Sequence, residues 1–317
     1  MIRYFGISDG VFQELDLLKE ASWVNLSPPY QDGELEQLAT TLKISTDFLT
    51  DPLDIEERAR YEKYDEARSI IFHTPVVNET EKENDPIFIT IPVGIILCQG
   101  KIITVSAWDN PVLEKFCHFK IKGFDPRNER LFILQLFEQT VLLFLDYLKK
   151  LNLRRSLIEE ELYHSSRSGE LKSLLRIEKS LVYFVNSLNA NELLKIKMRR
   201  TDFLGIKDNE DLLDLFEDII VDNNQAREVA QLYTNILNGT MEAYASIISN
   251  NLNKFVNRLT VITIILMVPT LVASFFGMNV HLPFWLGDSA YSFYIILFLS
   301  ISFSLGLAWF FKVKDVL

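Results

Sequence analysis

The sequence predicts an α/β domain followed by a helical region and by two helices that span a membrane. Three observations support this prediction. Strand patterns separated by turn residues fill roughly the first 125 residues. After Pro126 the pattern is helical, and no further proline occurs until Pro269. Two segments near the end, residues 259–276 and 291–311, contain no Lys, Arg, Asp or Glu, and each is close to the roughly 20 residues that a bilayer core requires.

The composition is that of a folded, acidic protein. The chain has 317 residues, with 43 acidic and 32 basic side chains, so its net charge is −11. A charged fraction of 24% is ordinary for a folded protein and argues against intrinsic disorder. The excess of acid argues against nucleic-acid binding, which needs a basic surface. The two cysteines, Cys98 and Cys117, are too few for a disulfide framework and suit a reducing compartment.

Residues 1–125 are predicted to form the α/β head. Apolar runs bounded by turn residues predict five strands, and the dipeptide Gln99-Gly100 between the last two is a typical hairpin turn. Apolar residues three and four apart predict two helices in the same region, at residues 34–42 and 111–120. The predicted strands are residues 2–7, 21–26, 67–73, 87–98 and 101–108.

The rest of the cytoplasmic domain is predicted to be helical. Residues 208–276 show the longest helical pattern, which we divide into a stalk helix (208–258) and a first transmembrane helix (259–276). A continuous helix of this length measures about 100 Å at about 1.5 Å per residue, so it needs packing partners along its length. Before it, the helical part of the domain covers residues 126–207, with helices expected at 131–153, 169–188 and 191–203.

The charges around the two apolar segments predict their orientation. Lys254 and Arg258 precede the first segment, and Lys312 and Lys314 follow the second, whereas the loop between the segments has no Lys or Arg. Positively charged flanks stay on the cytoplasmic side, so we expect a multi-pass protein of the cell membrane with both termini in the cytoplasm. The N-terminus lacks the apolar core of a signal peptide. The expected segments are the first helix 259–276, the extracytoplasmic loop 277–290, the second helix 291–311 and the cytoplasmic tail 312–317.

Counting in sevens along the predicted long helix gives one mainly polar stripe. A period of 3.5 is typical of a helix that packs against copies of itself. Small polar residues in membrane helices also serve close packing, but four hydroxyl side chains on one stripe favour a helix that lines a water-accessible axis. One helix cannot enclose a pore, so we expect a cyclic oligomer. The stripe consists of Glu242, Ser246, Ser249, Asn253, Val256, Thr260, Thr263, Met267, Thr270 and Ser274.

The first apolar segment is followed by the tripeptide Gly277-Met278-Asn279. Placed after the first of two terminal spans, behind a long charged helix and an acidic α/β head, this tripeptide resembles the signature of the CorA family of divalent-cation channels. The resemblance implies a funnel-shaped homopentamer in the lipid bilayer, with the first membrane helices around the pore. It also implies that Gly277, Met278 and Asn279 form the selectivity filter, where amide and carbonyl oxygens would hold a hydrated ion through its waters.

The same resemblance implies roles for residues of the long helix. Asn253 matches a polar pore ring, and Glu242 matches an acidic ring nearer the cytoplasm. The family often has Met at position 256 and Pro directly after position 267. The hydrophobic constriction of the family's pore matches Val256, Leu259 and Met267. Here Val256 and Pro269 differ from the family pattern, so we expect a wider constriction and a displaced kink. The expected pore-lining and gate residues are Asn253, Val256, Leu259, Thr260, Thr263 and Met267.

The resemblance further implies that carboxylates between neighbouring subunits sense cytosolic Mg²⁺. Asp218 stands at the matching position, within a segment rich in Asp and Glu. A divalent ion bound there would relieve the repulsion between like-charged subunits. A run of acids is also the ordinary solvated face of a helix, and both interpretations stay open. The candidates for a partner of Asp218 on the head are, by composition alone, Glu81, Glu83 and Asp85.

The implied function is passive influx of Mg²⁺, together with Co²⁺ and Ni²⁺, gated by cytosolic Mg²⁺. No cofactor is expected apart from Mg²⁺ as substrate and regulatory ligand, and no enzyme is expected, because Gly-Lys-Ser/Thr, His-Glu-x-x-His and Cys-x-x-Cys are all absent from the sequence. The adjacent Cys117 and His118 are too close to chelate one metal ion easily. Two alternatives stay open, namely a zinc-transporting branch of the same superfamily and a two-span membrane anchor that conducts nothing.

Overall fold

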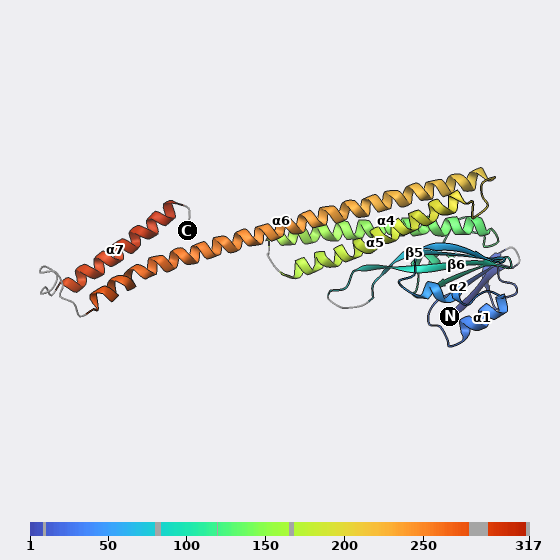
Figure 1. Cartoon of the computed structure of the whole chain (residues 1–317), viewed down its shortest axis with the longest axis horizontal. Helices are drawn as coiled ribbons and strands as arrows, with labels where there is room; N and C mark the ends of the chain where they lie inside the picture. The colour runs from blue at the N-terminus through green and yellow to red at the C-terminus, as the bar shows by residue number, and fades with distance from the viewer. Residues whose placement is uncertain (9–10, 80–83, 119, 165–167, 279–290, 315–317) are drawn as a thin grey trace. The chain divides into compact units, whose positions relative to one another are not determined.

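The computed structural model describes residues 1–317 apart from 9–10, 80–83, 119, 165–167, 279–290 and 315–317. The chain divides into two compact units, Met1–Gly239 and Thr240–Leu317. The first unit contains a sheet with helices on both sides, the long ones all on one side, and the second contains the C-terminal part of the longest helix and the last apolar helix (Figure 1).

A seven-stranded sheet in the order β2-β1-β3-β7-β6-β5-β4 forms the centre of the first unit. All neighbouring strands are antiparallel except β3 and β7, which run parallel and pair Trp23 with Ile102. Five of the seven strands were predicted, and the two edge strands β2 and β4 were missed because most of their side chains are exposed or polar. The strands are β1 Ile2–Ser8, β2 Val11–Leu15, β3 Trp23–Leu26, β4 Arg60–Tyr64, β5 Ala67–Val77, β6 Phe88–Cys98 and β7 Lys101–Ser106.

Successive side chains along each strand point to opposite faces of the sheet, and both faces are covered by helices. Val24 and Leu26 of β3 lie in the cluster that covers the face toward α1 (Glu34–Leu42) and α2 (Asp47–Thr50). A short 3₁₀ helix, η1 (Asp51–Leu53), follows α2. Trp23, on the opposite face, packs edge-on against Phe132 of α4 (Glu129–His164) with ring centres 5.2 Å apart.

The other face of the sheet is covered by helices that come later in the chain. Phe72 of β5 meets Phe137 of α4 at 5.1 Å, and Phe88 of β6 stacks on Tyr147 of α4 at 4.3 Å. Asn110 begins α3 by accepting hydrogen bonds from the backbone of Val112 and Leu113, at 2.9 and 3.3 Å. The helix predicted at 111–120 ends at residue 117. The remaining helices are α3 Pro111–Cys117, α4 Glu129–His164, α5 Ser168–Arg200, α6 Glu210–Phe276 and α7 Ser292–Val313.

The prediction of separate helices at 169–188 and 191–203 was wrong, because α5 is continuous to Arg200. Asn191 lies within it, is 1% exposed, and its side chain pairs with the backbone of His73 on β5. Its Oδ1 accepts from the His73 N–H at 2.9 Å and its Nδ2 donates to the His73 carbonyl at 2.8 Å. The pairing of β4 with β5 reaches only as far as Ile71, so the Asn191 amide replaces a missing strand at this edge.

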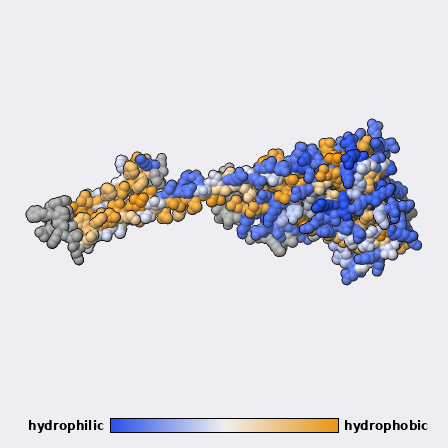
Figure 2. All heavy atoms as spheres, in the orientation of Figure 1, coloured by the Kyte–Doolittle hydropathy of each residue, from blue (hydrophilic) through white to orange (hydrophobic). Residues whose placement is uncertain are grey.

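Among the described residues, three helices are long and apolar enough to cross a membrane by length and composition: α4, α6 and α7. The apolar window of α4 is 61% buried inside the first unit, whereas those of α6 and α7 are only 6% buried. Figure 2 shows a mainly hydrophobic surface on the helices of the second unit and a mainly hydrophilic one on the first. The exposed apolar helices are therefore the two that the sequence assigned to the membrane.

Candidate functional site

The polar stripe predicted on the long helix lies on the exposed surface of α6. All ten of its residues, from Glu242 to Ser274, are exposed in the second unit. Val256 and Met267, the apolar members that were assigned to a constriction, are 48% and 58% exposed. Leu259, which was assigned to the same constriction, lies one residue off the stripe and is 54% exposed.

The opposite side of α6 is the side that packs within the second unit. Val261 is 3% exposed, and Ile265, Val268 and Val272 are half-buried. At about 100° per residue, these four positions lie about 150° around the helix from the membrane part of the polar stripe. An apolar cavity between α6 and α7 is lined by Val268, Val272, Phe276, Ile295, Ile296, Leu299, Ser300 and Phe303. The polar stripe is thus turned away from α7.

The threonines of the stripe present oxygen atoms outward. The hydroxyl groups of Thr260, Thr263 and Thr270 donate to the carbonyl oxygens four residues earlier in α6, at 2.9, 2.8 and 3.1 Å. Each hydroxyl thereby uses its hydrogen inside the helix and keeps its lone pairs as acceptors. The waters of a hydrated cation point their hydrogens outward, so these oxygens suit a hydrated cation as a neighbour.

The end of α6 carries the first two residues of the Gly-Met-Asn tripeptide. The N–H of Gly277 donates to the Ala273 carbonyl at 2.9 Å, so helical bonding continues to this residue. Met278 follows and is 55% exposed. Asn279, the third predicted filter residue, lies outside the described residues.

The stripe continues toward the N-terminus beyond the ten residues predicted from the sequence. Counting back from Glu242 with the same alternation of three and four residues reaches Asp218, and every position on the way is exposed. The opposite face of α6 in the first unit carries buried residues, among them Phe216, Ala226 and Ala230. The additional stripe residues are Asp218, Val221, Gln225, Glu228, Leu232, Asn235 and Gly239, and extending the count in sevens would have found them.

The acidic run around the predicted sensor does not gather into a metal site in one chain. Asp218 is exposed, and the neighbouring Glu217 pairs with Arg199 of α5 at 2.5 Å. No group of three or more His, Cys, Asp or Glu side chains within the described ranges is arranged to hold a metal ion. Of the candidate partners on the head, Asp85 is described, whereas Glu81 and Glu83 lie outside the described residues.

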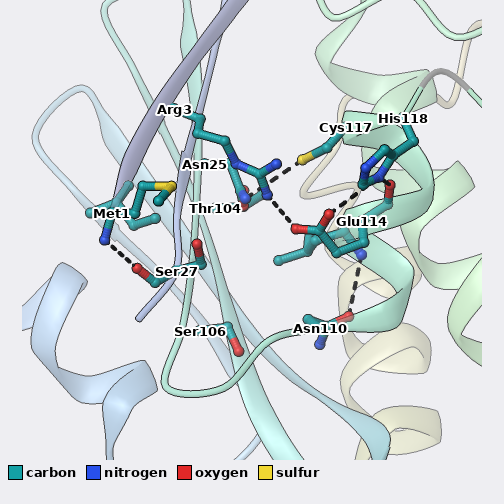
Figure 3. Close-up of polar contacts among 12 residues, drawn as sticks. Met1, Arg3, Asn25, Ser27, Thr104, Ser106, Asn110, Glu114, Cys117 and His118 are labelled. Carbon is teal, nitrogen blue, oxygen red and sulfur yellow. Dashed lines mark hydrogen bonds and ion pairs between the residues drawn. The ribbon is translucent and has the colours of Figure 1, made fainter. Parts of the chain in front are cut away.

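The Cys117–His118 pair belongs to a structural network of the head (Figure 3). The Cys117 thiol is buried and accepts a long contact from the Asn25 side chain at 3.6 Å, and burial raises the pKa of this thiol to about 12. Glu114 of the same helix pairs with Arg3 of β1 and lies 3.2 Å from the His118 ring. The network ties α3 to the sheet and leaves the thiol protonated at neutral pH.

Comparisons with known proteins find a matching family and related proteins. The family described as CorA-like Mg²⁺ transporter protein matches residues 19–312 of the chain. The cobalt/magnesium transport protein CorA of Methanocaldococcus jannaschii is 25% identical over 285 residues, which cover 88% of this chain and 86% of that protein. The protein of the same name from Thermotoga maritima is 21% identical over 264 residues, or 81% of this chain and 73% of that one.

The complete structure of the CorA magnesium transporter from Methanocaldococcus jannaschii has the same fold. It superposes with a TM-score of 0.83 at 21% identity, and the match covers 100% of this chain and 99% of that chain. The α/β domain, the long helix and the two C-terminal apolar helices therefore occur together in a solved protein.

Proposed function

The chain belongs to the CorA-like Mg²⁺ transporter family, and from this premise we propose that it is a channel for the influx of Mg²⁺, and also of Co²⁺ and Ni²⁺, through the cell membrane. The family is one of transporters, not of enzymes. The observation that carries the proposal is the polar stripe of α6, which is exposed throughout and turned away from α7. A polar face on a membrane helix needs either water or another polar face.

Several copies of α6 together would provide the water-filled path. One helix cannot enclose a pore, and the 3.5-residue period of the stripe fits helices that pack around a common axis. We propose a homopentamer, as the family resemblance implies, with α6 around the axis and α7 outside it. Residues 1–125 and 126–207 then form the cytoplasmic domain, 208–258 the stalk, 259–276 and 291–311 the membrane helices, and 277–290 the outer loop.

The proposed pore would conduct a cation in its hydrated form. Mg²⁺ dehydrates reluctantly, and a filter with the carbonyl oxygens of Gly277 and the amide oxygens of Asn279, packed by Met278, would hold the hydrated ion without trapping it. The hydroxyl oxygens of Thr260 and Thr263 would accept hydrogen bonds from the same waters further along. No carboxylate occurs in the apolar segment itself, so the ion would leave as readily as it enters.

Two rings and one constriction would complete the path on the cytoplasmic side. Asn253 would add a ring of amide oxygens, and Glu242 a ring of carboxylates that raises the local cation concentration. Val256, Leu259 and Met267 would form the apolar constriction, which closes by excluding water. Asp218 would bind regulatory Mg²⁺ between subunits, so that cytosolic Mg²⁺ favours the closed state.

Both termini would lie in the cytoplasm. The basic residues Lys254, Arg258, Lys312 and Lys314 flank the two apolar segments on the sides not joined by the 277–290 loop, and such residues stay on the cytoplasmic side. Transport would need no cofactor. A membrane potential of about 100 mV favours entry of a divalent cation by about 4.6 kcal/mol, twice the single-charge value. Passive flow would therefore suffice for uptake.

Mg²⁺ flux into proteoliposomes tests the proposal, with wild type compared to Asn279→Ala. We expect the variant to lose selective flux while it keeps its oligomeric state, because the amide ring of the filter is gone. Asn251→Ala is the matched control, since Asn251 is an exposed asparagine of α6 away from the stripe. It should conduct like the wild type.

The same assay separates the alternatives. Zn²⁺ flux that excludes Mg²⁺ would favour a zinc transporter, and absence of flux of every divalent cation in the wild type would favour a non-conducting anchor. Wild-type Mg²⁺ flux and selectivity in Asn279→Ala would refute the filter assignment. Suppression of flux by internal Mg²⁺ in the wild type would support gating.

A further inference from the structure

A lysine of α5 is enclosed where three helices meet. Lys195 is 1% exposed. Its Nζ donates to Asn223 Oδ1 of α6 at 2.6 Å and lies 5.4 Å from the ring centre of Phe137 on α4. Lysine is rarely buried to this degree, because its charged form loses hydration. The proposed ion path does not use this side chain.

Asn223 joins the lysine to the backbone of α5. It is fully buried, and its Nδ2 donates to the Leu188 carbonyl at 2.9 Å. An ion pair between Glu192 of α5 and Arg227 of α6, at 2.7 Å, lies one helical turn away. We call the contacts of Lys195, Asn223, Leu188, Glu192 and Arg227 the α5–α6 seam.

The seam suits a neutral amine better than an ammonium. A protonated lysine has three N–H donors, and within the described part of the chain it has one hydrogen-bond acceptor, the side-chain oxygen of Asn223, and the weaker attraction of the Phe137 ring face. Burial lowers the pKa of Lys195 to about 7, against a smaller opposing effect of Glu192. Glu192 is itself held by Arg227, while α4 offers an aromatic ring and α6 an amide.

We propose that Lys195 is a proton-sensitive lock, whose protonation loosens the α5–α6 seam and whose deprotonation closes it. The ammonium gains hydration only if α6 separates from α5 far enough to admit water. Since α6 continues from the seam into the polar stripe, the order of the stalk then varies with cytosolic pH. The lock itself stands on the seam contacts alone, and only its effect on flux rests on the function proposed above.

The shifted pKa of Lys195 predicts the direction in which stability changes with pH. The unfolded lysine holds its proton up to about pH 10.4, whereas the folded one releases it near 7. Between these values the unfolded state binds more protons, so the contribution of Lys195 makes stability rise with pH. Below about pH 7 both states are protonated and the contribution no longer changes.

Hydrogen exchange of the full-length protein in detergent micelles tests the lock. Wild type, Lys195→Met and the control Lys197→Met are compared at the same pH, so that the intrinsic exchange rate is common to all three. Methionine fills the space without a charge, and Lys197 is an exposed lysine of the same helix. The peptides of interest cover residues 188–199 and 216–230.

At about pH 6 protonated Lys195 is about tenfold more abundant than neutral Lys195 in the folded protein. At about pH 8.5 the neutral form is about thirtyfold more abundant than the protonated one. We expect wild type and Lys197→Met to exchange in the seam severalfold faster than Lys195→Met at the lower pH, and all three to agree at the higher. An equal ratio of rates at both pH values would overturn the proposal.

A second variant keeps the test decisive if Lys195→Met does not fold. Asn223→Asp places a carboxylate against Nζ, which should keep the lysine protonated and paired across the same pH range. After correction for the intrinsic exchange rate, hydrogen exchange in the α5–α6 seam of this variant should therefore not vary with pH. Persistence of the wild-type pH dependence in Asn223→Asp would contradict the lock.

Flux measurements test the effect of Lys195 on gating separately from the channel function proposed above. If the wild type conducts, internal Mg²⁺ should inhibit it less strongly at about pH 6 than at about pH 8.5, and Lys195→Met should remove most of this difference. The same inhibition at both pH values in the wild type would refute the link to gating. If nothing conducts, the channel proposal fails, while the exchange experiment still decides on the lock.

Discussion

At the scale of single residues, the structure shows where the candidate site residues lie, while their roles in transport stay predictions. Gly277 and Met278 follow directly on α6, as the tripeptide suggested, and the exposed Asp218 stands on the same register as the stripe. Lys195 could not be predicted, because it lies in a run of basic residues typical of a surface. Only the packing of Phe137 and Asn223 around it reveals its burial.

Asp218 also defines a prediction at this scale. Asp218→Ala should leave the channel conducting at cytosolic Mg²⁺ concentrations that close the wild type. Half-inhibition should need about tenfold more internal Mg²⁺, which corresponds to a coupling energy of about 1.4 kcal/mol. Flux into proteoliposomes loaded with graded Mg²⁺ measures this shift.

The control for this variant is Asp146→Ala, because Asp146 is an exposed acid on α4, paired with Lys150. It should keep the wild-type inhibition curve. Inhibition of Asp218→Ala at the wild-type concentration would place the sensor at other residues.

At the scale of elements, predictions succeeded where periodicity was strong and failed where tertiary contacts decide. The helix predicted over residues 208–276 is present as α6, because its apolar residues recur along one face. The edge strands β2 and β4 gave no alternation of buried and exposed residues. The break predicted near residue 190 is absent because Asn191, a residue that often ends helices, is bound by β5.

The contact of Asn191 with β5 makes a testable contribution to stability. Asn191→Ala leaves the N–H and the carbonyl of His73 without the partner that continues the sheet. Loss of such buried partners costs about 1–3 kcal/mol, and each kcal/mol lowers Tm by about 2–4 °C in a unit of this size. Thermal unfolding of the full-length protein in detergent measures the change.

Asn189→Ala provides the comparison, since Asn189 is an exposed asparagine of the same helix. Its Tm should stay within about two degrees of the wild type, because surface substitutions rarely exceed about 0.5 kcal/mol. Equal Tm values for the two variants would mean that the Asn191 contact contributes little.

At the scale of the whole molecule, the order of the parts could be predicted and the order of the strands could not. Composition alone separates an acidic body from two uncharged segments. The pairing of β3 with β7 joins residues far apart in the sequence, and no local pattern specifies it. The assembly of several copies stays a prediction, since it concerns contacts between chains.

The proposed pentamer can be tested by cross-linking at the stripe. Ser249→Cys should form disulfides between neighbouring copies under mild oxidation, because the proposed pentamer places this position at the shared axis. The native Cys98 and Cys117 are buried and should not take part. In a ring of five, each thiol pairs with one neighbour, so at least one chain in five stays uncross-linked.

The fraction of cross-linked chains, measured on a gel without reducing agent, therefore shows whether the ring has an odd number of subunits. Complete cross-linking would contradict an odd-numbered ring. Asn251→Cys is the control away from the stripe, and it should yield far less dimer. Equal yields for the two variants would contradict the placement of the stripe at the axis.

The burial of α4 has a consequence for the synthesis of the protein. This helix is apolar enough to enter a bilayer, yet 61% of its apolar window is covered by the first unit. All seven strands of the sheet precede α4 in the chain, so the ribosome has already made the sheet face on which α4 packs when α4 emerges. The nascent chain can therefore begin to cover this helix before the apolar parts of α6 and α7 are translated, which would leave to the insertion machinery the two segments that we propose cross the bilayer.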